Sequence, residues 1–318
     1  MIRPVLKYLL LGLLVLLCLP VILGFLLASE TVNRWLFQKV MDQEPRLHLE
    51  LSEGQLWRGW QFEQVVWRDE GIEVVIDQVR VAWSPDCLFK TRLCIDELDI
   101  ESIHIQSKPS EDPAPERQAV TLPELNLPID IQLERIRIGS LWLNNEQPLL
   151  TDMYLSAYSR GDQLVIQRFT GNGPDLDWQL DGDLRMTGDW PLQINAAVTL
   201  PPVDERDWSA DIRLDGSLND LEIKAFSRGY LEGILSARGN PLEAELPLML
   251  AWQGEAFLPL QEWPETLTLN DLRLQLSGNL DSGFVLQGNA HFPGSGGRID
   301  LDLDAQAGLS GISELVLQ

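Results

Sequence analysis

Positive charge is scarce in this sequence. Its 318 residues include 24 lysines and arginines against 48 aspartates and glutamates, which leaves a formal net charge of −24. Nucleic acid is therefore excluded as a partner, because binding to phosphates requires a cationic surface. The same deficit argues against electrostatic binding to anionic lipid headgroups. A solvated, self-repelling surface that resists aggregation accounts for the acidity.

Histidine is also rare, and the residue patterns of common catalytic sites are absent. The three histidines, His48, His104 and His291, are far apart in the sequence. His104 lies between Ile103 and Ile105, where a solvated strand residue is expected. No nucleophile elbow, phosphate-binding loop or histidine-pair metal motif occurs. We therefore expect no enzymatic activity, no cofactor and no metal site.

One long stretch lacks charge altogether. Tyr8–Ala28 is 21 residues without a charged side chain, long enough to cross a bilayer as a helix. Arg3 and Lys7 precede it, so the positive-inside rule places the N-terminus in the cytoplasm and translocates the rest. A cleaved signal peptide is the alternative, but Leu26–Ala28 carries a bulky residue where a small one is needed. Residues 1–28 are predicted to be an uncleaved signal anchor, with residues 8–28 spanning the membrane.

A short juxtamembrane helix is predicted within residues 29–46. Ser29 can serve as its N-cap, and Val32, Trp35, Leu36 and Val40 fall near one face. Trp35 would suit an anchor at the membrane interface.

From Leu47 onward the pattern is that of β-strands. In residues 95–105 and again in 129–143, apolar residues alternate with polar ones, skip by three positions, and then resume alternating. Period two indicates a strand with one apolar face, and the skip fits a β-bulge or a tight reversal. The candidate residues of an apolar groove are Val74, Ile76, Val79, Val81, Leu98, Ile100, Ile103, Ile105, Ile129, Ile131, Leu133, Ile136 and Ile138.

The strand pattern divides into two segments. Residues 47–106 are the first β-sheet segment, residues 107–120 are a proline-rich loop or linker, and residues 121–318 continue the repetitive sheet. Gly216 and Gly278 stand at positions where the alternating pattern otherwise has a large apolar residue, which indicates a kink or a close backbone approach. The expected fold is mainly β, with an elongated, antiparallel, curled sheet following the anchor. A compact β-sandwich would need longer Greek-key connections.

Two further features bear on function. Cys87 and Cys94 flank a short connection on the translocated side, where a disulfide is expected and two reduced thiols are the alternative.

Eleven tryptophans are present, and Trp57, Trp60 and Trp83 lie among apolar residues, which favours packing over sugar stacking. The apolar face must be covered. It could pack on itself or hold an apolar ligand, and the anchor favours a ligand from the bilayer.

Several motifs together carry a family resemblance. They are the Gly54–Gly59 turn, the Val79–Pro85 strand exit and the Cys87–Leu98 segment. With the anchor, they resemble the N-terminal region of the TamB family within the wider AsmA-like group. The resemblance implies a β-taco with a hydrophobic groove, in a single-pass inner-membrane protein of a Gram-negative bacterium whose bulk is periplasmic.

The implied function is phospholipid passage to the outer membrane, together with support of outer-membrane protein assembly through a TamA-like barrel partner. Members of the family are several times longer and have a C-terminal domain for that partner, so we expect this chain to be a fragment or the product of a truncated gene. A scaffold for outer-membrane β-proteins without lipid transport, or an envelope polysaccharide-binding protein, are the alternatives.

Overall fold

A computed structural model describes residues 29–317, except residues 56, 58, 70, 108–118, 145–146, 204–205, 230, 258–267, 295–296 and 309–310. The predicted membrane span and most of the proline-rich loop lie outside the described residues. No helix within the described part of the chain is long and apolar enough to cross a membrane.

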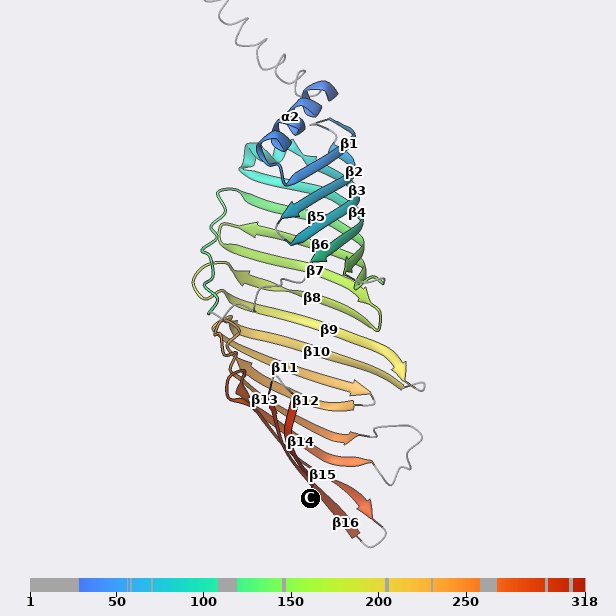
Figure 1. Ribbon diagram of the computed structural model, residues 1–318, viewed down its shortest axis with the longest axis vertical. Coiled ribbons are helices and arrows are strands. Elements are labelled where there is room, and N and C mark those ends of the chain that lie inside the picture. Colours follow the sequence, from blue (N-terminus) through green and yellow to red (C-terminus); the bar gives the residue numbers. More distant parts are fainter. Residues whose placement is uncertain are drawn as a thin grey trace, which may run out of the picture. The chain divides into compact units, whose positions relative to one another are not determined.

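The described chain is mainly antiparallel β-sheet, as its period-two pattern predicts (Figure 1). It forms two compact units. Unit 1 contains the described residues within Met1–Pro109 and Gln132–Leu149, and unit 2 contains those within Ser110–Ile131 and Leu150–Gln318.

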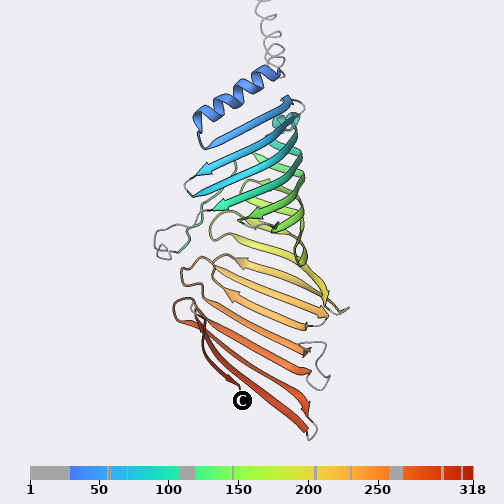
Figure 2. The same cartoon turned by 45° about the vertical axis from the view of Figure 1, so that its right-hand side comes forward.

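Unit 1 consists of a helix followed by a meander in which each strand pairs with the next, visible in the blue to cyan part of Figure 2. Most of β5 lies beside β4, and the Arg135 guanidinium of β5 pairs with Glu97 of β4 at 3.0 Å. The elements are α2 (Glu30–Gln43), β1 (Leu47–Gln55), β2 (Gly59–Asp69), β3 (Ile72–Ser84), the 3₁₀-helix η1 (Pro85–Lys90), β4 (Arg92–Ser107) and β5 (Asp130–Leu143).

Helix α2 packs on the first strands of unit 1. The Phe37 ring lies edge-on to Trp60 at 5.9 Å and to Phe62 at 5.3 Å between ring centroids. Asn33 is only 3% exposed. Its amide accepts a hydrogen bond from Trp60 Nε1 and donates one to the Ser29 carbonyl, as a buried amide requires. Ser29 occupies the predicted N-cap position, but its hydroxyl makes no capping hydrogen bond.

Unit 2 contains the remaining strands, and each pairs antiparallel with the next strand in the sequence. In β8 every second side chain, from Leu176 to Leu184, is half-buried, and every side chain between them is exposed. The strands are β6 (Leu150–Arg160), β7 (Gln163–Gly173), β8 (Leu176–Arg185), β9 (Pro191–Val203), β10 (Arg206–Ser217), β11 (Asp220–Gly229), β12 (Leu231–Gly239), β13 (Leu248–Phe257), β14 (Leu269–Asn279), β15 (Gly283–Gly294), β16 (Gly297–Gly308) and β17 (Gly311–Leu317).

The sequence predicts sheet from residue 121, but the first strand after the loop begins at Asp130. Pro123 and Pro128 interrupt this stretch, and proline cannot donate to a strand ladder. In unit 2, the strap formed by residues 119–129 instead runs along the hairpin turns. Its N–H groups donate to turn carbonyls: Leu127 to Gly161, Leu125 to Met186 and Val120 to Leu242.

Candidate functional site

The predicted groove residues of β3 and β4 form cross-strand rows with apolar residues of β2. Residues in one row are direct partners on neighbouring strands, so their side chains project from the same face of the sheet. The rows are Trp60–Val81–Leu98, Phe62–Val79–Ile100, Val65–Ile76–Ile103 and Trp67–Val74–Ile105.

In each of β2, β3 and β4, one interval between successive apolar residues is three positions instead of two. These three intervals lie side by side in the sheet. Ile76 pairs with Ile103 and Val79 pairs with Ile100, so the register of β3 and β4 is the same on both sides of the skip. The sequence left open a β-bulge or a tight reversal, and between β3 and β4 neither occurs at this level. On the other side of β2, its register with β1 shifts between Glu50 and Leu51. Within β3, Gln78 has a left-handed φ of 51°, which breaks the alternation and returns the next apolar residues to the original face.

A second skip, between Ile95 and Leu98, is a true bulge. Trp83 pairs with Ile95 and Val81 pairs with Leu98, with a register shift between Ala82 and Trp83. The extra residue on β4 keeps both pairs apolar, as a bulge does. Two different devices therefore keep one face of unit 1 apolar.

All thirteen predicted groove residues are at least half-buried. Val79 and Ile136 are buried, at 8% and 6% exposure, and the other eleven are partly exposed. The residues after the loop are divided between the units: Ile129 and Ile131 belong to unit 2, and Leu133, Ile136 and Ile138 belong to unit 1.

Unit 2 carries a more extensive apolar face, whose residues were not among the predicted site residues. Three rows cross the nine strands from β8 to β16, and each row contains only apolar residues and glycines. The sequence did carry a signal for this face, because apolar residues recur at even-numbered positions in the segments that form β8–β10 and β13–β15. The rows are Leu180–Ala196–Ile212–Ala225–Leu235–Trp252–Leu274–Gly288–Leu303, Gly182–Ile194–Leu214–Ile223–Ala237–Leu250–Leu276–Leu286–Ala305 and Leu184–Leu192–Gly216–Leu221–Gly239–Leu248–Gly278–Phe284–Ala307.

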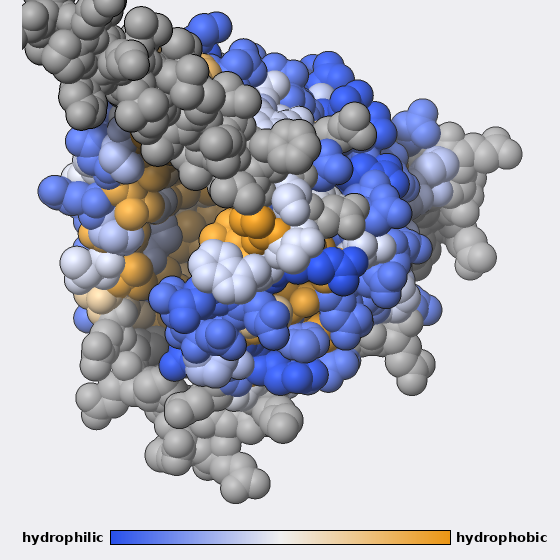
Figure 3. All heavy atoms as spheres, turned by 90° about the horizontal axis from the view of Figure 1, so that it is seen from above, coloured by the Kyte–Doolittle hydropathy of each residue, from blue (hydrophilic) through white to orange (hydrophobic). Residues whose placement is uncertain are grey.

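These rows are only partly covered. Most of their large side chains, such as Leu214, Leu250 and Leu274, are half-buried, and the row residues that are fully buried are alanines such as Ala225 and Ala305. Within the described chain, no large side chain is less than 2% exposed. A sandwich core would bury such leucines completely. Figure 3, a view from above onto the end that carries α2, shows apolar residues in a hollow of the surface with hydrophilic residues around it.

The opposite face of unit 1 is polar, and several of its side chains bond one another, although one buried oxygen of Asp99 has no hydrogen-bond partner among the described residues. Asp77 accepts hydrogen bonds from Gln64 Nε2 at 2.9 Å and from Ser102 Oγ at 3.1 Å. His104 Nε2 lies 3.1 Å from the same Ser102 hydroxyl, and the His104 ring stacks on Trp142 with centroids 5.4 Å apart. The sequence predicts His104 as a solvated strand residue. The structure leaves it half-exposed but in contact with these partners.

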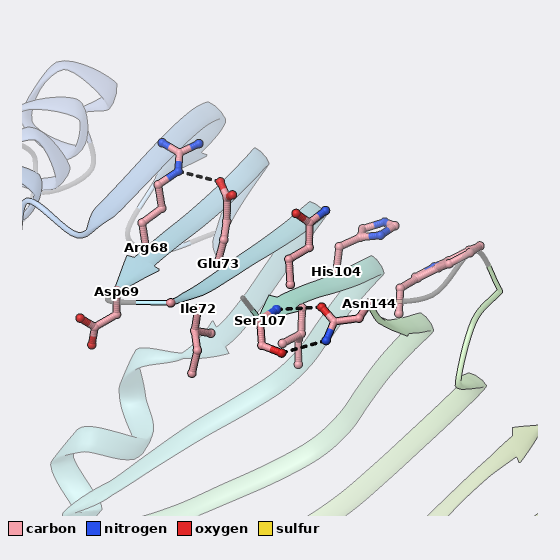
Figure 4. A pocket seen from close by; sticks show the side chains of 11 residues that line it. Arg68, Asp69, Ile72, Glu73, His104, Ser107 and Asn144 are labelled. Atoms are coloured by element: carbon pink, nitrogen blue, oxygen red, sulfur yellow. Dashed lines mark hydrogen bonds and ion pairs between the residues drawn. The ribbon is translucent and has the colours of Figure 1, made fainter. Parts of the chain in front are cut away.

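A cavity of about 500 Å³ lies beside this polar row (Figure 4). Arg68 pairs with Glu73 at 2.6 Å, and Asn144 exchanges two hydrogen bonds with Ser107. Ile72 points away from Glu73 and His104 in this view. Because these polar groups satisfy one another, the geometry gives no reason to assign a ligand to this cavity.

Two of the tryptophans in the apolar face of unit 1, Trp60 and Trp83, pack against each other. Trp60 stacks on Trp83, with ring centroids 6.1 Å apart and planes 15° from parallel. Phe37 covers the edge of Trp60 from α2. These contacts are aromatic packing, the interpretation that the sequence favours for both residues. Trp57 is half-exposed.

Cys87 and Cys94 form a disulfide that joins η1 to β4. Cys94 is buried, at 4% exposure. The bond closes a short loop whose tip carries Phe89, which is 92% exposed. Among the described residues, no group of three or more His, Cys, Asp and Glu side chains could hold a metal ion.

Comparison with known proteins identifies the family. A family profile described as TamB, N-terminal domain, matches residues 19–121 and 106–313. No curated protein and no solved structure matches the chain. The profile spans the strands of both units as far as the start of β17, including the rows described above. The chain belongs to the TamB family.

Proposed function

We propose that this chain is an anchored, nonenzymatic segment of a lipid conduit, whose apolar face carries phospholipid acyl chains between the inner and outer membranes. The observation that carries the proposal is the set of three apolar rows in unit 2. Most of their large side chains are half-buried, and so remain partly exposed, across nine strands. The polar phase of the same strands faces water, so one sheet offers an apolar path with a solvated exterior.

The dimensions of the rows fit acyl chains. With neighbouring strands about 4.8 Å apart, eight intervals between β8 and β16 give a path of roughly 40 Å. One acyl chain covers about half of a hydrocarbon core that is about 30 Å thick, or roughly 15 Å. Each row is therefore longer than one acyl chain, and a lipid could move along it without leaving an apolar surface.

The energetics favour an occupied face. Burial of apolar surface contributes roughly 25 cal/mol per Å², and soluble monomers seldom expose contiguous patches above about 300–600 Å². Acyl chains would cover the rows without requiring any specific hydrogen bond. Glycines and alanines are interspersed among the larger apolar residues of each row, which leaves space for an acyl chain between the larger side chains.

Membership of the TamB family supports the cellular context of the proposal. It favours a single-pass inner-membrane protein with its N-terminus in the cytoplasm and its bulk in the periplasm. It also favours support of outer-membrane protein assembly with a TamA-like partner. The uncharged Tyr8–Ala28 stretch supplies the anchor in this proposal.

The test compares two adjacent residues of β14. Leu274 lies on the apolar face and is half-buried, whereas Gln275 lies on the other face and is exposed. Phospholipid that copurifies with the anchored chain is quantified by mass spectrometry, and ultraviolet cross-linking from a photoreactive residue at Leu250 reports contact with lipid. Leu274→Asp should reduce bound lipid at least threefold, because an ionised carboxylate would face the acyl chains. Gln275→Asp should leave bound lipid unchanged.

Unit 1 provides a second pair of variants. Ile103→Asp places a carboxylate on the apolar face of β4. Gln106→Asp places the same charge on the exposed polar face of the same strand. Each variant is first checked for a wild-type circular dichroism spectrum. Equal lipid content in folded Ile103→Asp, Leu274→Asp and wild-type chains would eliminate the conduit. Glycan in place of lipid would do the same and would favour the polysaccharide-binding alternative.

A further inference from the structure

We infer that α2 lies in the membrane interface, with Trp35, Leu36 and Val40 among the lipid headgroups. In this position, α2 holds the first row of the apolar face of unit 1 next to the bilayer surface. This inference rests on the proposed lipid function and on anchoring through residues 8–28. It adds a lipid-contacting surface outside the groove.

The helix presents apolar residues to solvent instead of to the sheet. Trp35 is 62% exposed, Leu36 is 42% exposed and Val40 is 40% exposed. At about 100° per residue, these side chains span an arc of about 140° that adjoins the buried side of the helix. The contacts with the sheet come instead from Asn33 and Phe37, and from Met41, whose sulfur accepts a hydrogen bond from the Leu49 N–H.

The position of α2 in the sequence indicates what covers this arc. The uncharged stretch ends at Ala28, and α2 begins at Glu30. Two residues reach at most about 7 Å. A helix so close to the end of a membrane-length stretch begins at the interface, where tryptophan is enriched. The occupant is therefore a bilayer surface.

The charges on α2 fit the same position. Arg34 and Lys39 are exposed and flank Trp35 in sequence. By the same helical spacing, Lys39 lies within the apolar arc, where its stem can lie along apolar surface while its ammonium group reaches the phosphates. With a net charge of −24 on the whole chain, the attachment must depend mainly on apolar burial. It should therefore depend only weakly on salt.

The opposite side of α2 links this surface to the groove. Phe37 contacts Trp60 and Phe62, which begin the first two rows of unit 1. Trp35 is about 160° away from Phe37 around the helix, and a helix is about 10–12 Å across with its side chains. With Trp35 among headgroups, the first row starts roughly 10 Å from them. A lipid could then reach the apolar face without its acyl chain crossing open water.

The experiment measures depth in the bilayer for single positions on α2. Full-length chain in a Cys18→Ser background receives an environment-sensitive fluorophore at Leu36→Cys or, as a matched control, at Gln38→Cys. Gln38 is exposed on the polar side of the same helix. The chains are reconstituted into phosphatidylethanolamine–phosphatidylglycerol vesicles that contain lipids brominated near the headgroup.

Quenching at position 36 should exceed quenching at position 38 at least threefold, and should change little between 50 and 500 mM salt. A label at Arg80, which is exposed on β3, should not be quenched. Equal quenching at positions 36 and 38, or none at position 36, would overturn the inference. If bound lipid still responds to Leu274→Asp while position 36 is unquenched, only this inference fails. If position 36 is quenched but no lipid copurifies, the conduit fails instead.

Discussion

Ile76 of β3 is the direct cross-strand partner of Ile103 of β4, and the same register pairs Val79 with Ile100 beyond the polar break. The two strands therefore bend together. A bulge on one strand would have shifted one of these pairs by a residue. The apolar face of unit 1 continues through the break because neither strand gains a residue over the other.

A double-mutant cycle tests this register. Ile76→Ala and Ile103→Ala should show a coupling energy of about 0.5–1 kcal/mol, because partners on one face of an antiparallel pair interact directly. The measurement is the free energy of unfolding in urea. Ile76 and Leu98 lie on opposite sides of the break and should show a coupling of less than about 0.3 kcal/mol. Coupling as small for Ile76 and Ile103 would contradict the register.

Much of this architecture follows from the period of the sequence. Period two predicted antiparallel strands, and the position of Leu98, Ile100, Ile103 and Ile105 predicted an apolar phase that the rows reproduce. These features depend on the burial of alternate side chains, which is a local property of a strand. The skip of three was visible as well, but its meaning depends on the partner strand, which a single strand does not specify.

Contacts between distant residues could not be read from the sequence. The stacking of His104 on Trp142 joins two strands separated by the proline-rich loop. Asp77 was one acidic residue among 48, and only the register shows that it receives hydrogen bonds from Gln64 and Ser102. The helical face of α2 was predicted, but which side meets the sheet is decided by Phe37, whose partners lie more than twenty residues later.

The disulfide should stabilise unit 1. A loop of about eight residues closed by a disulfide contributes roughly 2–3 kcal/mol in the chain-entropy model. Reduction should therefore lower the urea midpoint and speed tryptic cleavage after Lys90, which is exposed in the loop between Cys87 and Cys94. Cys87→Ser/Cys94→Ser should show the reduced behaviour with or without reductant. If reductant still lowers the urea midpoint of this double variant, its effect does not come from the Cys87–Cys94 disulfide.

Gly216 should tolerate no side chain. Its φ is 107°, and a Cβ there would lie 2.3 Å from the Asp220 carbonyl oxygen across the hairpin. Gly216→Ala should reduce the stability of unit 2 by about 1–3 kcal/mol. Gly308→Ala is the matched control, because no atom lies within 4 Å of its Cβ position. Its effect on the urea midpoint should be within about 0.5 kcal/mol of zero. Similar losses for both variants would argue against the close approach.

The Arg238–Asp220 pair should be lost at acidic pH. The side-chain hydrogen bond from Arg238 lowers the pKa of Asp220 below its ordinary value. A lowered folded-state pKa means that the stabilisation is present above the unfolded pKa, near 3.9, and is lost as pH falls through the folded value. Carboxyl NMR should find a lower pKa for Asp220 in the wild-type chain than in Arg238→Gln. The two chains should become equally stable once Asp220 is protonated. A pKa unchanged by the substitution would contradict the pairing.

Phe37 should hold α2 over the first strands, and its loss should expose the edge of β1. Phe37 contacts both Trp60 and Phe62, and removal of a partly buried aromatic ring costs about 2–3 kcal/mol, less than in a full core. Phe37→Ala should therefore speed hydrogen exchange in α2 and β1. An uncovered edge strand pairs with other chains, so light scattering should show oligomers at high protein concentration.

Trp35→Ala is the matched variant, because Trp35 lies on the same helix and is mostly exposed. In detergent, it should leave exchange in β1 and the oligomeric state unchanged. Slow exchange in Phe37→Ala would mean that α2 stays in place without the ring. In that case, the hydrogen bonds that Asn33 and Met41 accept from Trp60 and Leu49 would be sufficient to hold α2, and the covering of the β1 edge would not depend on aromatic packing.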